Sequence, residues 1–516
     1  MKDQKREEAK SGVRLCIHRA ADAIGGNCIE IAASTGERLL LDAGRPLDTP
    51  EGEPTPIPPT LDTTMSVAGV LLSHAHADHC GLLETLPADW PVYCGQATER
   101  LLRLSAAIGQ KPLAQGLAHW EDGKAMPIGP FTVMPHRIDH SAFDAYALQI
   151  DVEGKTILYS GDFRAHGRES ERTERLMQNP PEQVDVLIME GTNLPAMRRE
   201  RLMMRRGRPL LTEREVDAAL RGIPGIQGEQ GPQLLTEREV NAAPRWDRPQ
   251  YTTSTVTVAE LEEWVEAEVE AMPPDPLMEA LFRRYAPKPT ATEAELEEQF
   301  TGLFKKCQGR VFVSWSSTNI DRAVTLYNAC KNSGRVLVPD LYCLVVLMRL
   351  GEFDKKIPQP EWEGGHMRAV VTNKMKFVME RLGEPDLVEY LKRHHAAMSA
   401  RALADNPERW VIMARGSLLN DYAAKGVIPN EQDALVWSMW EGYLRLESSQ
   451  ALRKFFAPCR YEYIHSSGHA SPEVLRRFAE AMRPKMLIPV HGEAWEDHKG
   501  NFPAAHILPN GTWMNL

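Results

Sequence analysis

Three histidines and an aspartate crowd into one short loop, and this loop constrains the chain more than any other feature. The sequence reads HAHADH from His74 to His79, after the apolar run 67–72 and before the helix-like GLLETL at 81–86. Imidazole nitrogen and carboxylate oxygen are ligands for zinc and similar divalent metals. Four such groups in six positions crowd a single ion, so the loop predicts two adjacent metals. A solvated His-rich loop is the alternative, but HxHxDH on a strand-to-helix loop favours metal binding.

The chain of 516 residues is long enough for two or three domains. Its net charge of −11 excludes a surface that is basic overall. Any nucleic acid would therefore have to bind in a local basic channel. None of the eight cysteines forms a CxxC pair, which is typical of a reduced cytosolic chain. The start MKDQKREEAK is charged, and no segment approaches the roughly 20 apolar residues that span a bilayer. We therefore expect a cytoplasmic protein with no signal peptide and no membrane contact.

Further metal-binding residue types recur where later strands are expected to end. Apolar strands precede Asp162 in TILYSGDFR, Glu190 in VDVLIMEGTN and His491 in KMLIPVHGE. His140 lies in HRIDHSAFDAYALQI and His469 in HSSGHAS. Loops at such strand ends converge in layered α/β folds, so these side chains should gather. Two divalent ions roughly 3.5–4 Å apart would turn a bridging water into hydroxide at neutral pH and clamp both reacting oxygens. Asp162 is well placed to bridge them, and a histidine outside the ligand set could protonate the leaving oxygen.

The middle of the chain has a different composition from both ends. Six arginines gather in 198–208, a candidate lid that contacts phosphate, with a solvated helix face as the alternative. Residues 209–308 are largely acidic and helix-prone and contain a near-repeat, LLTEREVDAAL and LLTEREVNAAP, to which we attach no chemistry. We interpret them as a variable helical insertion. Residues 309–350 alternate strand and helix, which predicts a small parallel sheet.

Five segments, HAHADH, DHSAFDAYAL, YSGDFR, HSSGHA and PVHGE, resemble the motifs of the metallo-β-lactamase superfamily. More narrowly they resemble its β-CASP nucleases, with bacterial ribonuclease J as the nearest example. The resemblance implies an α/β fold, a metallo-β-lactamase αββα sandwich made from 1–207 and 445–516. A β-CASP-like α/β domain at 208–444 would be inserted into it and would include the acidic segment 209–308.

The resemblance also implies seven ligands shared between two divalent ions, zinc or manganese. His74, His76 and His140 would hold one ion, Asp78, His79 and His491 the other, and Asp162 would bridge them.

The remaining motif residues are implied to handle the substrate. His469 would be the general acid or a phosphate contact, supported by Glu190. Ser467 and Gly468 would offer donors to a phosphate. Thr318 and Asn319, in a segment that resembles the one contacting the nucleic-acid backbone, are further candidates, with helix capping as the alternative. Asp42 and His465 are expected to support the ligands. The other histidines are expected to be structural or superficial: His18, His119, His136, His166, His366, His394, His395, His498 and His506.

The predicted function is hydrolysis of phosphodiester bonds in single-stranded RNA by hydroxide bound to two metals, in RNA processing or decay. Two other activities stay open, namely a small-molecule metallo-hydrolase and a DNA nuclease of the same superfamily. A catalytically inactive scaffold is a third alternative, although the complete ligand set argues against it. Partners would be RNA, further copies of the chain or RNA-decay proteins. The further C-terminal domain that ribonuclease J uses in assembly is not expected, which leaves oligomerisation open. Exonuclease or endonuclease mode cannot be read from the residues.

Overall fold

The computed structural model describes residues 12–195 and 290–516, apart from gaps at 51, 110–112, 363, 372–378, 380–385, 446–448 and 503. It also describes the short strand pair β12 (Met204–Arg205) and β13 (Arg208–Pro209). The chain divides into one unit made of Met1–Leu194 with Pro287–Leu516, and a second of Pro195–Ala286. Most of the arginine-rich segment and both copies of the repeat lie outside the described residues.

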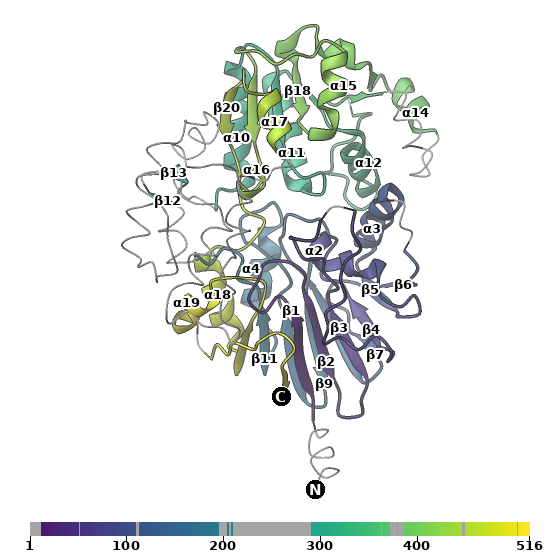
Figure 1. The fold of residues 1–516 in the computed structure, drawn as a ribbon, viewed down its shortest axis with the longest axis vertical. Coiled ribbons are helices and arrows are strands. Elements are labelled where there is room, and N and C mark those ends of the chain that lie inside the picture. The colour runs from purple at the N-terminus through teal and green to yellow at the C-terminus, as the bar shows by residue number, and fades with distance from the viewer. Residues whose placement is uncertain are drawn as a thin grey trace, which may run out of the picture. The chain divides into compact units, whose positions relative to one another are not determined.

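Two facing sheets form the first part of the large unit (Figure 1). The first sheet has the order β22-β1-β2-β3-β4-β5-β6. Its strands are β1 (Arg14–Arg19), β2 (Cys28–Ala32), β3 (Arg38–Leu41), β4 (Gly69–Leu71), β5 (Val92–Cys94), β6 (Leu117–His119) and β22 (Trp513–Asn515). The second sheet has the order β21-β11-β10-β9-β8-β7. Its strands are β7 (Met126–Ile128), β8 (Phe131–Arg137), β9 (Tyr146–Val152), β10 (Lys155–Tyr159), β11 (Val186–Met189) and β21 (Met486–Pro489).

Apolar side chains from both sheets share one core, which makes the pair a sandwich. Leu15, Ile29 and Leu39 of the first sheet pack with Leu148 and Ile188 of the second. Helix α3 (Gln96–Gly109) shares a separate core with buried side chains of the first sheet. Helix α4 (Ser170–Gln178) contacts both α18 (Pro472–Met482) and strand β8 of the second sheet. The predicted αββα layering is therefore confirmed.

A third sheet, all parallel, forms the inserted part in the order β15-β18-β14-β19-β20. Its strands are β14 (Val311–Ser314), β15 (Val336–Val338), β18 (Trp410–Met413), β19 (Ala434–Trp437) and β20 (Arg460–Tyr463). The first four are buried along their whole length, as expected for parallel strands covered on both faces. The helices with it are α10 (Glu293–Lys306), α11 (Ile320–Ser333), α12 (Leu341–Leu350), α14 (Leu387–Arg393), α15 (Leu419–Ala424), α16 (Gly442–Arg445) and α17 (Gln450–Phe455). A two-stranded sheet joins β16 (Ala369–Val370) and β17 (Ala397–Met398).

Two details differ from the sequence-based expectation. The sequence assigned 209–308 to a variable insertion, but its last helix, α10, buries Leu296, Phe300 and Phe304 in the core of the inserted part. This helix begins with a capping box between Thr292 and Glu295, and its apolar residues recur at helical spacing. The third sheet also continues to β20, beyond the residue 444 at which the sequence placed the end of the insertion. In the described part of the chain, no helix is long and apolar enough to cross a membrane.

Candidate metal centre

Three of the site residues follow strands of the second sheet and lie at one edge of that sheet. Strands β10, β11 and β21 are parallel neighbours, and Asp162, Glu190 and His491 follow their carboxyl ends. The parallel register forces these loops to emerge side by side. The loop after β4 adds the HAHADH motif, whose last residues form the short helix α2 (Ala77–Cys80).

His74, His76 and His140 form the first group of candidate ligands. Nε2 of His74 lies 3.1 Å from Nδ1 of His76, and Nε2 of His140 lies 3.2 Å from the same atom. All the candidate ligand atoms of this group lie within 4.8 Å of one another. Three ring nitrogens that meet so closely suit one shared cation.

Hydrogen bonds on the far side of two rings fix which nitrogen of each faces the group. Nδ1 of His140 lies 2.7 Å from the carbonyl of Gly468, which can only accept, so Nδ1 carries the proton. The hydroxyl of Ser73 donates to Asp42, at 2.8 Å, and must therefore accept from Nδ1 of His74, 3.0 Å away. In both neutral rings Nε2 is left unprotonated, which is the form that binds metal.

Asp78, His79, Asp162 and His491 form the second group, again within 4.8 Å of one another. Nε2 of His79 lies 2.9 Å from Oδ2 of Asp162, and Nε2 of His491 lies 3.6 Å from it. Nδ1 of His79 contacts Asp42 at 2.7 Å, and Nδ1 of His491 contacts the side-chain oxygen of Asn27 at 2.7 Å. The Nδ1 atoms are thus occupied by oxygen acceptors while the Nε2 atoms face Asp162.

Buried atoms without a hydrogen-bond partner test whether this group fits a metal. Nε2 of His79, Nε2 of His491 and both carboxylate oxygens of Asp162 are buried and make no hydrogen bond. The 2.9 Å contact between His79 and Asp162 lacks the alignment of one. Leaving such groups unpaired in the interior costs several kcal/mol, whereas a divalent cation among them would satisfy them together. The residues present therefore fit a metal centre.

Electrostatics favour the metal-binding forms of Asp162, His74 and His140. Burial alone would raise the pKa of Asp162, but the charges of His491 and His79 hold it well below its usual value. Burial, and after it the neighbouring histidines, keeps the pKa values of His74 and His140 well below normal. Asp162 is therefore a carboxylate at neutral pH, and these two histidines are neutral.

His469 lies beside two carboxylates and keeps part of its side chain exposed. Its Nδ1 lies 3.2 Å from Glu190 and 3.6 Å from Asp162, and its side chain is 22% exposed. Burial would lower the pKa of His469, but Glu190 and then Asp162 raise it to about 9. Glu190 is held in place by the backbone N–H of Phe163, which donates to it at 2.9 Å. An accessible imidazolium beside the two ligand groups can donate a proton.

The loop before His469 is held from several sides. Asn193 donates to the hydroxyl of Ser467 at 2.9 Å, and Arg164 donates to the carbonyl of Ser467 at 3.2 Å. A Cβ at Gly468 would lie 2.6 Å from the hydroxyl of Ser141, so the loop approaches the His140 loop as closely as glycine permits.

Thr318 and Asn319 precede helix α11, and Asn319 is its N-cap. The side chain of Asn319 accepts from the backbone N–H of Arg322 at 3.0 Å, which is the capping offered above as the alternative. The hydroxyl of Thr318 pairs with that of Ser316 at 2.9 Å. A backbone bridge joins Asn319 to Ala142, so this loop reaches the His140 loop.

Sequence reasoning anticipated the support from Asp42 but missed other supporting residues. Asn27 and Tyr159 complete the network, because Tyr159 donates to Asp42 at 2.6 Å and Asn27 donates to Tyr159 at 2.9 Å. Arg164 was also missed, although it belongs to the YSGDFR motif. Its buried guanidinium contacts Asp139 at 3.4 Å and Asp321 at 2.5 Å, which ties the sandwich to the inserted part.

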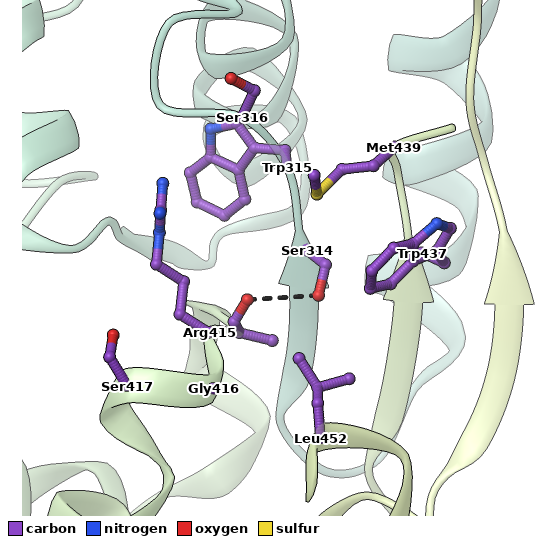
Figure 2. A pocket seen from close by; sticks show the side chains of 10 residues that line it. Ser314, Trp315, Ser316, Arg415, Gly416, Ser417, Trp437, Met439 and Leu452 are labelled. Atoms are coloured by element: carbon purple, nitrogen blue, oxygen red, sulfur yellow. Dashed lines mark hydrogen bonds between the residues drawn. The ribbon is translucent and has the colours of Figure 1, made fainter. Parts of the chain in front are cut away.

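A separate cavity of about 320 Å³ lies at the carboxyl ends of β14, β18 and β19 (Figure 2). Trp315, Trp437 and Met439 line it together with Arg415. Nε of Arg415 forms an ion pair with Asp340 at 2.6 Å. In open parallel sheets this edge is where ligands bind.

Family models match both ends of the sandwich. Residues 37–222 match a beta-lactamase superfamily domain, and residues 458–498 match a Zn-dependent metallo-hydrolase RNA specificity domain. The second match contains Ser467, Gly468, His469 and His491.

Individual relatives agree with these matches. An "RNase J-like protein" of Methanocaldococcus jannaschii is 29% identical over 194 residues, 35% of this chain and 42% of the relative. A "Ribonuclease J" of Sinorhizobium meliloti is 26% identical over 134 residues, 25% of this chain and 24% of the relative. The chain spans less than half the length of the curated relatives it matches. A solved structure of a protein of unknown function from Enterococcus faecalis aligns with a TM-score of 0.62 at 16% identity, over 98% of this chain and 100% of that one, which shows a shared fold.

Proposed function

The chain belongs to the metallo-β-lactamase superfamily, and on that premise we propose that it is a metal-dependent ribonuclease of the β-CASP type that hydrolyses phosphodiester bonds of single-stranded RNA. The observation that carries the proposal is the convergence of two groups of histidine rings on the unpaired buried carboxylate of Asp162, beside His469. Relatives named as ribonucleases and the RNA specificity match at 458–498 support RNA as the substrate.

In this proposal two groups of side chains would hold two divalent ions, zinc or manganese, and Asp162 would be available to both. The first group is His74, His76 and His140, and the second is Asp78, His79 and His491. Such ions would lower the pKa of water and offset the negative charge of a phosphodiester. Asp42, Asn27 and Ser73 keep the ligand rings oriented with their unprotonated nitrogens inward.

His469 supplies the proton that the leaving oxygen needs. Glu190 keeps the ring charged and oriented through the 3.2 Å contact with Nδ1, which leaves Nε2 as the donor. Ser467, Gly468, Thr318 and Asn319 are proposed to contact the phosphate backbone.

The sequence-based limits, 1–207 with 445–516 for the sandwich and 208–444 for the insertion, are proposed with one change: the insertion extends through β20 (Arg460–Tyr463). Further copies of the chain and RNA-decay proteins stay predicted partners, and the cytoplasm stays the predicted compartment.

One incubation tests the proposed function. Purified full-length protein loaded with zinc or manganese is mixed with single-stranded RNA carrying a 5′-monophosphate or a 5′-triphosphate and labelled at either end. We expect metal-dependent cleavage, and product lengths that reveal exonuclease or endonuclease mode and direction. The Asp162→Asn variant serves as control and should be inactive, because it loses the carboxylate shared by both groups.

Two results would contradict the proposal. Undiminished cleavage by the Asp162→Asn variant would refute the shared-ligand site. Intact RNA with metal-loaded protein would refute the ribonuclease, and parallel reactions with single-stranded DNA and with small phosphodiesters would identify which alternative activity replaces it.

A further inference from the structure

Two aromatic side chains just beyond the carboxyl end of β19 are left in solvent. Trp440 is 48% exposed and Tyr443 is 38% exposed. Their rings meet edge to face, with centroids 5.4 Å apart and an interplanar angle of 88°. Trp and Tyr contribute large contact areas when they are covered, so two exposed rings in contact mark a surface for binding.

The backbone beneath the two rings is fixed. Nε1 of the buried Trp437 donates to the carbonyl of Trp440 at 3.1 Å, and the hydroxyl of Ser449 donates to the carbonyl of Tyr443 at 2.7 Å. The indole of Trp440 packs against Gly442. A Cβ atom on residue 442 would lie only 2.1 Å from the indole ring. The glycine therefore permits the position of the indole, and the pair forms a preorganised platform.

The segment that carries the platform is tied to the HSSGHA loop. Ser438, at the start of its segment, donates to the carbonyl of Ile464 at 2.6 Å, and Ile464 leads into the HSSGHA loop. Ala75, between two candidate ligands, packs against the same core cluster as Ile464.

A cavity of about 320 Å³ begins at the residue before the platform. Met439, which precedes Trp440, lines the cavity together with Trp437 (Figure 2). Arg415 lines it as well, held by Asp340 and by the hydroxyl of Ser317. An arginine in this cavity would be available to a phosphate of a strand whose base stacks on an exposed ring.

We propose that Trp440 and Tyr443 form a stacking subsite that holds an unpaired base of the RNA substrate beside the metal centre. This inference rests on the proposed function and deepens it. Stacking on an aromatic face does not depend on base identity, so the subsite would select single-stranded RNA over paired RNA without selecting a sequence.

The test compares two substrates and three proteins. One substrate is a single-stranded oligoribonucleotide, and the other has the same length and phosphates but abasic riboses. The full-length, metal-loaded proteins are wild type, Trp440→Ala and the matched control Trp513→Ala. Trp513 is 39% exposed on β22, under the guanidinium of Arg14. The ratio of kcat/KM for the two substrates is measured, with binding by fluorescence anisotropy in chelator as a second readout.

We expect wild type to prefer the RNA that carries bases. Trp440→Ala should reduce this preference by roughly five- to 150-fold, the loss expected for one stacked base, and Trp513→Ala should not change it. Anisotropy should show the same loss of RNA affinity in Trp440→Ala. Tyr443→Ala should give a loss in the same direction.

Three outcomes would overturn the inference. An unchanged preference in Trp440→Ala would show that no base stacks on this ring. An equal loss for both substrates would show general damage instead of lost stacking. Wild-type protein that cleaves RNA without any preference for bases would refute the subsite but keep the ribonuclease, whereas wild-type protein that cleaves no RNA would refute both.

Discussion

Replacing Asp42 with asparagine should release metal although the residue touches no ion in our assignment. Oδ2 of Asp42 accepts from the hydroxyls of Ser73 and Tyr159 and from Nδ1 of His79, at 2.6–2.8 Å. Oδ1 accepts from the backbone N–H of Ser73 at 2.7 Å. An amide can keep only one acceptor oxygen, so at least one donor would face an NH2 group.

The ring most affected is His79. If Nδ1 loses its acceptor, the neutral ring can carry its proton on Nε2, the nitrogen that faces Asp162, and that nitrogen no longer binds metal. Supporting hydrogen bonds of this kind are worth roughly 10- to 100-fold in metal affinity. Asparagine is the informative substitution because Asp42 has a φ of 56°, a left-handed conformation that asparagine also adopts readily and alanine does not.

The assay is metal stoichiometry by mass spectrometry, with affinity from competition against a chromogenic chelator. Asp433→Asn is the matched control, since Asp433 is equally buried and accepts from Arg310 at 2.8 Å within the inserted part. The control should lose stability but keep its metal. Wild-type metal affinity in a folded Asp42→Asn protein would refute the argument from ring orientation.

Three further predictions follow from individual residues. His469→Ala should lower kcat roughly 10²- to 10⁴-fold with an unchanged metal content, because the residue acts as proton donor and not as ligand; a loss of metal would contradict this role. Gly468→Ala should reduce activity, since its Cβ would lie 2.6 Å from the hydroxyl of Ser141, and Ser141→Gly in the same chain should restore it; a fully active Gly468→Ala protein would show that the contact is harmless. For Glu293, burial would raise the pKa, but Arg322 and Arg164 lower it to about 2, so the folded carboxylate adds stability above pH 4.5 that is lost as the pH falls toward 2. Glu293→Gln should therefore cost about 3 kcal/mol in urea unfolding at pH 7 and progressively less below pH 4.5, and a cost independent of pH would exclude this linkage.

Much of the fold and of the candidate site could be predicted from motifs in the sequence. Acids and a histidine at strand ends were enough to predict that Asp162, Glu190 and His491 would gather, because parallel strands have their carboxyl ends at one edge of the sheet. The hairpin turn at Gly154 and the helix at 96–108 were also readable, since both depend on local chemistry.

Contacts between distant segments could not be predicted in the same way. Asn27 orients His491 across 464 positions of sequence, and no local pattern signals such a pairing. The buried charges of Arg164, Asp321 and Glu293 join segments whose proximity only the fold creates. Helix α10 was assigned to a variable insertion because its acidic surface dominates the composition, while its buried Leu296, Phe300 and Phe304 decide its place in the core.

The most direct test of the account is to locate the metal ions in crystals of the protein grown with zinc, by anomalous scattering at the zinc edge. The account predicts two peaks per chain, each roughly 2.0–2.2 Å from its ligand atoms. One would lie among His74, His76 and His140, the other among Asp78, His79 and His491, with Asp162 contacting both. A single peak, or zinc bound away from Asp162, would contradict the central claim.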